Sequence, residues 1–177
     1  MTRANEPKEP MLFEGSRFSI YQMTLEGEDG KTYKREVVRH PGAVVLLPVL
    51  DDGRVVMIEN TRPTVNETLL ELPAGTREPD ETAATTAYRE LIEETGFTAG
   101  KIDLIHEFFS APGISDELMH LYHATDLTEG TPRREATEVI VNRVATREEI
   151  QTWIGSGKIR DAKTLVGLYA YLSLYPG

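Results

Sequence analysis

The feature that most constrains this chain is an acidic helix predicted within residues 75–97. It places three carboxylates, Glu90, Glu93 and Glu94, at spacings i, i+3 and i+4. On an α-helix these positions cover about 100° of one face. Like charges at these spacings destabilise an isolated helix by about 0.2–0.5 kcal/mol per pair. A bound cation would offset that repulsion, and a hard divalent cation with oxygen ligands is the simplest candidate.

The ends and the inner face of this helix follow from its sequence. We expect Asp80 to be the N-cap and Gly96 to end the helix in the left-handed conformation. Ala84, Tyr88 and Leu91, at i, i+4 and i+7, are predicted to face the core. The acidic face is therefore predicted to lie away from the packing face.

The composition fits one globular domain and argues against several classes of function. The 177 residues carry 19 Lys and Arg against 29 Asp and Glu, a net charge of −10 that is unfavourable for nonspecific nucleic-acid binding. There are no cysteines, so disulfides, zinc thiolates and a thiol nucleophile are excluded. No run approaches the roughly 18 apolar residues of a membrane span, and residues 1–10 lack an apolar signal core. We expect a soluble, cytoplasmic protein with no nucleic-acid or membrane partner.

Hydrophobic patterning predicts strands on both sides of the helix. Residues 17–26 alternate apolar and polar side chains, Asp29-Gly30 signals a hairpin turn, and residues 31–38 form the partner strand. Residues 42–50 are almost continuously apolar, as in a strand buried on both faces. The other predicted strands are 54–59, 68–72, 103–109, 118–124 and 139–144, and the other helices are 147–154 and 162–174. These elements indicate an α/β fold with a mixed sheet between helices and an N-terminal antiparallel strand pair.

The residues around the acidic helix resemble a known motif. The Nudix box has the pattern G-x5-E-x7-R-E-U-x-E-E-x-G-U, where U is a bulky aliphatic or aromatic residue. Every specified position is filled, by Gly75, Glu81, Arg89, Glu90, Leu91, Glu93, Glu94, Gly96 and Phe97. At average residue frequencies a chance match at a given start is about one in 10⁹. The chain is therefore identified as a member of the Nudix hydrolase family, which implies a Nudix-type α/β/α sandwich.

Segments outside the box resemble the ADP-ribose pyrophosphatase branch of that family. They are residues 71–75 (ELPAG), 110–113 (SAPG) and 115–117 (SDE), and Pro112 fills the place of a proline that marks this branch. The resemblance implies Mg²⁺-dependent hydrolysis of ADP-ribose to AMP and ribose 5-phosphate. Another nucleoside diphosphate sugar, such as GDP-mannose, stays open as the substrate. A non-catalytic sensor of nucleotide sugars is the alternative from another class, although such modules can lose box carboxylates and here all are intact.

The resemblance also implies the metal ligands. Glu90 and Glu94 are the main ligands of Mg²⁺, for which Mn²⁺ can substitute. Glu93 is a ligand or a bridging group, and the carbonyl of Ala74 is a further ligand. Such a set suits Mg²⁺, which prefers carboxylate and water ligands. Arg89 is expected to orient the glutamates by bidentate hydrogen bonds, for example with Glu93.

Hydrolysis also needs a general base within reach of the attacking water. In the ADP-ribose pyrophosphatase branch this group is usually a glutamate on a loop after the box. Counting back from the following helix favours Glu138, with Glu135 as the alternative, and Glu117 is a third candidate. Arg133 and Arg134 make this loop less acidic than related loops.

The remaining expectations concern the substrate and a partner chain. Residues expected to contact the substrate are Arg62, Arg35, Glu36, Ser110, Gly113 and Glu117. We divide the chain into a flexible N-terminus (1–10), N-terminal strands that dimerise (11–40) and the Nudix domain (41–177). Members of this branch form dimers in which N-terminal strands pack across the partner. The resemblance therefore implies a homodimer in which Arg35 and Glu36 serve the partner's site.

Overall fold

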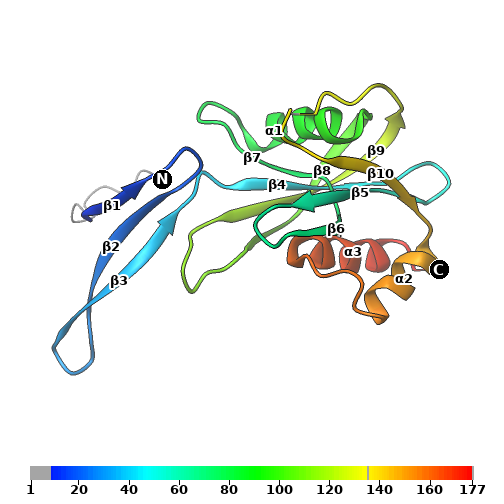
Figure 1. Ribbon diagram of the computed structural model, residues 1–177. Helices are drawn as coiled ribbons and strands as arrows, with labels where there is room; N and C mark the ends of the chain where they lie inside the picture. The colour runs from blue at the N-terminus through cyan, green and yellow to red at the C-terminus, as the bar shows by residue number, and fades with distance from the viewer. Residues whose placement is uncertain (1–8, 135, 177) are drawn as a thin grey trace.

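The protein is a three-layer sandwich with a separate N-terminal sheet. The computed structural model describes residues 9–134 and 136–176. Figure 1 shows helix α1 (Ala83–Glu90) on one side of the strands, and α2 (Arg147–Gly155) and α3 (Ala162–Leu174) on the other. This arrangement confirms the α/β/α class expected from the sequence. No helix in the described residues is both long and apolar enough to cross a membrane.

A mixed four-stranded sheet lies at the centre. One of its two inner strands, β4 (Ala43–Pro48), is buried along its whole length. It pairs antiparallel with β7 (Ala74–Thr76) and parallel with β9 (Leu118–Thr128), which pairs antiparallel with β8 (Thr98–Phe109). Residues of β4 enter both apolar clusters, one beside α1 and one beside α2 and α3, as its continuous apolar sequence predicts.

A second sheet brings two further site-bearing segments to the core. It has the order β10 (Ile140–Ala145), β5 (Val55–Arg62) and β6 (Glu67–Glu71), all antiparallel. The chain passes from β6 through Leu72 and Pro73 directly into β7, the strand that precedes the acidic helix. This connection places Ala74 beside the C-terminal part of the acidic helix, where its backbone N–H donates to Glu94.

The acidic helix consists of α1 and a π-helical turn, η1 (Leu91–Thr95). The N-cap is Thr82, whose hydroxyl accepts a hydrogen bond from the Thr85 backbone N–H at 3.1 Å. The expectation for Asp80 was therefore wrong, because a second good capping residue lies two positions later. Gly96 ends the helix in the left-handed conformation, with φ of 81°, as predicted.

The inner face of this helix differs from the prediction. Leu91 is fully buried, but Ala84 is exposed and Tyr88 is 43% exposed. The acidic face was expected to be outside, yet Glu90 and Glu94 are only 9% and 3% exposed. The prediction placed the ring of Tyr88 in the core. The buried face instead combines Ala87 with the two carboxylates.

Small residues let the helices approach the sheet closely. Ala87 is completely buried in the apolar cluster beneath α1. On the other side Gly167 of α3 faces Leu72, where an added Cβ would lie 2.3 Å from the Leu72 Cδ1. A larger side chain at either position would push a helix away from the strands that line the site.

The N-terminal strands form a sheet that projects from the sandwich, at the left of Figure 1. Strand β2 (Ser19–Glu26) pairs with β3 (Thr32–Arg39) across the predicted hairpin turn, and β1 (Met11–Glu14) adds a third strand that the sequence did not reveal. None of these strand residues is buried. Large apolar side chains exposed here are Met11, Leu12, Phe13, Phe18, Leu25 and Tyr33.

Candidate active site

A cleft of about 680 Å³ lies beside the acidic helix. The helix supplies one acidic wall, and strand β7 and the segment that follows it supply the floor. Described residues that line the cleft and matter below are Arg62, Ala74, Gly75, Arg77, Arg89, Glu90, Glu93, Glu94, Ser110, Glu117, Glu138, Asp161 and Lys163. The cleft therefore gathers most of the site residues predicted from the sequence.

Glu94 is the most deeply buried carboxylate of the wall. Its Oε2 accepts a hydrogen bond from the Ala74 backbone N–H at 2.8 Å, which ties the helix to β7. Burial raises the pKa of Glu94 to about 8, and the nearby carboxylates of Glu90 and Glu138 add to the rise against the effect of that N–H. Both burial and the neighbouring carboxylates disfavour the charged form of Glu94, so a nearby cation would stabilise it.

Glu90 occupies a similar position above Gly75. Burial raises the pKa of Glu90 to about 7, although Arg89 partly opposes the shift. A Cβ at Gly75 would lie 1.8 Å from the Glu90 Cδ, so only glycine leaves room for this carboxylate over the strand. The close approach fixes the Glu90 oxygens against the backbone of β7.

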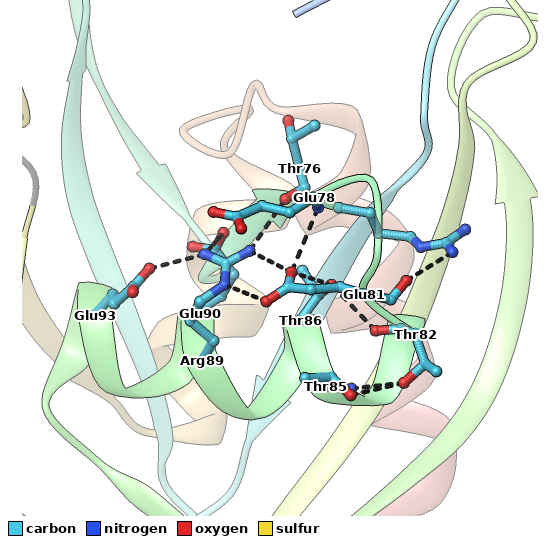
Figure 2. Close-up of polar contacts among 10 residues, drawn as sticks. Thr76, Glu78, Glu81, Thr82, Thr85, Thr86, Arg89, Glu90 and Glu93 are labelled. Carbon is cyan, nitrogen blue, oxygen red and sulfur yellow. Dashed lines mark hydrogen bonds and ion pairs between the residues drawn. The ribbon is translucent and has the colours of Figure 1, made fainter.

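Arg89 links the acidic side chains (Figure 2). Its Nε and Nη2 donate to the two carboxylate oxygens of Glu81 at 2.9 and 2.8 Å. Its Nη1 donates to Glu90 at 2.7 Å and to Glu93 at 2.8 Å. The predicted contact with Glu93 is thus present, but the bidentate partner is Glu81. The hydrogen bonds that Arg89 donates to Glu81 lower the pKa of Glu81 to about 2.

The donor set suits a hard cation. Two buried carboxylates, Glu90 and Glu94, face the cleft, and burial raises the pKa of each. In the described part of the chain no three acidic or histidine side chains already converge as a cation site. Arg89 Nη1 binds one oxygen of Glu90 and one oxygen of Glu93, so the second oxygen of each carboxylate does not accept a hydrogen bond from this guanidinium.

The three candidates for the general base have different positions. Glu138 lines the cleft and lies near enough to raise the pKa of both Glu90 and Glu94. Glu135 lies outside the described residues. Glu117 lies elsewhere in the cleft wall, where the Ser110 hydroxyl donates to its Oε2 at 2.5 Å. Of the two described candidates, Glu138 is close enough to Glu90 and Glu94 to shift their pKa values, whereas Glu117 is paired with Ser110.

Arg62 reaches the cleft from the end of β5 as part of a buried ion network. It donates two hydrogen bonds to Glu71, at 2.9 and 2.6 Å, and Glu71 is 1% exposed. Lys163, in the first turn of α3, donates to the same carboxylate at 2.8 Å and contacts Asp161 at 2.9 Å. Sequence reasoning missed Lys163, because no local pattern shows that the start of α3 meets the end of β6.

Of the other residues predicted to contact the substrate, some line the cleft and some do not. Ser110 and Glu117 line the cleft, but Gly113 is not among the described residues that do. Arg35 and Glu36 lie on β3 in the projecting sheet and do not line the cleft of their own chain.

A further cleft residue was not predicted. Arg77 donates from Nη2 to the Glu81 carbonyl at 2.9 Å, while its buried Nε has no hydrogen-bond partner among the described residues. Arg77 falls on an unspecified position of the motif, so the motif gave no signal for it.

Comparisons with known proteins find relatives along most of the chain. The profile of the NUDIX domain matches residues 38–165. An ADP-ribose pyrophosphatase of Bacillus subtilis (strain 168) is 39% identical over 166 residues, covering 92% of this chain and 89% of that protein. The methanol dehydrogenase activator of Bacillus methanolicus is 34% identical over 169 residues, covering 94% of this chain and 91% of that protein. A solved structure of an ADP compounds hydrolase, at 20% identity, has a TM-score of 0.78 over 96% of this chain and 97% of that chain, so the fold is shared.

Proposed function

This chain belongs to the Nudix hydrolase family, and from that premise we propose that it hydrolyses ADP-ribose to AMP and ribose 5-phosphate. The observation that carries the proposal is the pair of buried carboxylates, Glu90 and Glu94, facing a cleft of about 680 Å³. The Bacillus subtilis relative, which is named for this activity, supports the choice of substrate.

The proposed cofactor is Mg²⁺, with Mn²⁺ as a substitute. Glu90, Glu94 and the Ala74 carbonyl would hold the ion, with Glu93 as a further ligand once released from Arg89. When bound, Mg²⁺ neutralises phosphate oxygens and lowers the pKa of an attacking water. The site fits this role because positive charge would relieve the raised pKa values of Glu90 and Glu94.

The side chains of the cleft would divide the remaining work. Glu138 accepts a proton from water as the water oxygen bonds to phosphorus, and the bond from that phosphorus to the bridging oxygen breaks. Arg62 and Lys163 donate hydrogen bonds to phosphate oxygens from the ends of β5 and α3. Ser110 and Glu117, which also line the cleft, contact the sugar.

The proposed active form is a cytoplasmic homodimer. The projecting sheet exposes large apolar side chains, including Phe13 at 50% and Phe18 at 41%, which a second copy of the chain would cover. Arg35 and Glu36 do not line the cleft of their own chain, and in the dimer they would reach the cleft of the partner.

The test is a product assay with purified protein, Mg²⁺ and ADP-ribose, run beside GDP-mannose. We expect AMP and ribose 5-phosphate from the wild type, and a loss of kcat of about 1,000-fold in Glu94→Gln. Glu59→Gln is the matched control, because Glu59 is exposed on β5 away from the cleft. Faster turnover of GDP-mannose would change the substrate assignment, and calorimetric binding of ADP-ribose without turnover would identify a sensor instead.

A further inference from the structure

The loop that carries Glu138 is fastened to the C-terminal end of the acidic helix. The last carbonyl groups of a helix have no partner within the helix. Here the Arg134 Nε donates to the Glu94 carbonyl at 3.0 Å, and the Asn142 Nδ2 donates to the Thr95 carbonyl at 2.7 Å. A guanidinium is favourable at this position because the helix dipole is negative at its C-terminus.

Arg134 and Asn142 also bind each other. The Arg134 Nη2 donates to the Asn142 Oδ1 at 2.7 Å. Asn142 is itself fixed in β10, in register with Ile58 of β5. Arg134 and Asn142 therefore bind both the same helix terminus and each other.

Glu138 lies between Arg134 and Asn142 in the sequence. It lines the cleft together with Glu90 and Glu94. The next residue, Val139, accepts a hydrogen bond from the Thr61 backbone N–H at 3.1 Å. The segment after Glu138 is thus tied to β5 through the Val139 carbonyl. Before Glu138, the Arg134 side chain and the Arg133 backbone bind the end of the helix.

Arg133 provides an internal comparison. It has the same charge as Arg134 and is its neighbour, but its side chain is exposed. Its contact with the helix is made by its backbone N–H, which donates to the Glu93 carbonyl at 3.0 Å. Replacing the Arg133 side chain leaves that hydrogen bond in place, whereas replacing the Arg134 side chain removes two.

We propose that Arg134, through the Glu94 carbonyl and Asn142, is a positioning residue that holds Glu138 over the carboxylates of the cleft. The inference rests on the proposed function, in which Glu138 is the general base. The two arginines that make this loop unusually basic therefore differ in role, and only Arg134 is needed to place the base.

The experiment compares Arg134→Met, Arg133→Met, Glu138→Gln and the double variant Arg134→Met/Glu138→Gln with ADP-ribose and Mg²⁺. We expect Glu138→Gln to lower kcat by about 100-fold or more. Arg134→Met should lower kcat by about 10- to 100-fold with KM nearly unchanged, because the base is misplaced while substrate binding is kept. Arg133→Met should keep the wild-type kcat. The double variant should match Glu138→Gln, because a residue that acts through Glu138 has no effect once Glu138 is gone.

Two further measurements keep the test decisive. Arg134→Lys keeps a cation at the helix end but loses the fork that reaches two acceptors, so its kcat should be intermediate even if Arg134→Met fails to fold. Hydrogen exchange of the backbone amides of residues 136–139 should be faster by about tenfold in the Arg134 variants and unchanged in Arg133→Met.

Several results would overturn the inference. One is an equal kcat in Arg133→Met and Arg134→Met. Another is a fall in the kcat of the double variant that equals the product of the two single falls. The third is full activity in Glu138→Gln. If the wild type does not turn over ADP-ribose, the proposed function fails, and the exchange of residues 136–139 alone decides whether Arg134 holds the loop.

Discussion

The acidic helix and the N-terminal sheet differ in how far their side chains are buried by the rest of the chain. On the helix, Glu90 and Glu94 are 9% and 3% exposed, and both bind groups from their own chain. On the N-terminal sheet no strand residue is buried, and apolar side chains such as Phe13 face outward. A sheet with two uncovered faces gains little from burial of apolar surface.

The two regions also differ in how they are joined to the rest of the chain. The carboxylate wall is assembled by hydrogen bonds from β7, the helix and the loop before β10, all in one chain. The N-terminal sheet touches the loop of residues 110–117 mainly through Val38 and Arg39, which bond to Ile114 and Asp116. We therefore expect substitutions at the acidic helix to affect activity and metal binding, and substitutions in the N-terminal sheet to affect the oligomeric state.

The largest effect is expected at Gly75. In Gly75→Ala the new Cβ would lie 1.8 Å from the Glu90 Cδ, so the carboxylate must leave its place. We expect kcat/KM to fall by about 100-fold or more, because the displaced ligand no longer orients the reacting groups. Steady-state kinetics and Mg²⁺ titration by calorimetry measure the loss. Gly155→Ala is the control, since nothing lies within 4 Å of a Cβ there, and equal activity in both variants would contradict the packing argument.

The next effect separates the N-terminal sheet from the helix. The double variant Phe13→Asp/Phe18→Asp places charges on the exposed apolar face. We expect a monomer in light scattering and a fall in kcat/KM of about tenfold, because Arg35 and Glu36 would no longer reach the partner's cleft. Val65→Asp, at another exposed apolar side chain (55%), should change neither property. A fully active monomer would show that the cleft is complete without the sheet.

A smaller effect tests the electrostatics of the helix. Folding raises the pKa of Glu90 to about 7 and of Glu94 to about 8, from an ordinary value of 4.5. The folded protein then binds more protons than the unfolded chain, so without metal its stability falls as pH rises from about 4.5 to 8.

Saturating Mg²⁺ should reverse this loss, because the ion binds the deprotonated carboxylates. We expect Tm to rise by about 5–10 °C at pH 8 and by less than half as much at pH 5.5. Differential scanning calorimetry measures both shifts. Glu94→Gln should remove most of the difference between the two pH values, and an equal shift at both would contradict the assignment.

The smallest effect concerns the helix face that the sequence misjudged. Tyr88→Ala should lower the free energy of unfolding by less than about 1 kcal/mol, because the side chain is 43% exposed. Leu91→Ala should cost about 2–5 kcal/mol, because Leu91 is fully buried. Urea denaturation measures both, and similar losses would restore the predicted orientation of the helix.

Much of the fold was predictable because its signals are local. The continuous apolar run of β4, the hairpin of β2 and β3 and the Gly96 helix end each depend on a few adjacent residues. The orientation of α1 was not predictable in this way, since the cleft buries Glu90 and Glu94 against the trend of their polarity. A functional site is where local hydrophobic patterning is expected to fail.

Residue type and spacing along the chain were enough to identify the acidic motif, the positions of most strands and the family. Folding alone shows three sets of partners: Arg89 with Glu81, Lys163 and Arg62 with Glu71, and Arg134 with the Glu94 carbonyl. These partners are brought together by packing of separate elements, and no spacing within one element encodes a contact between two.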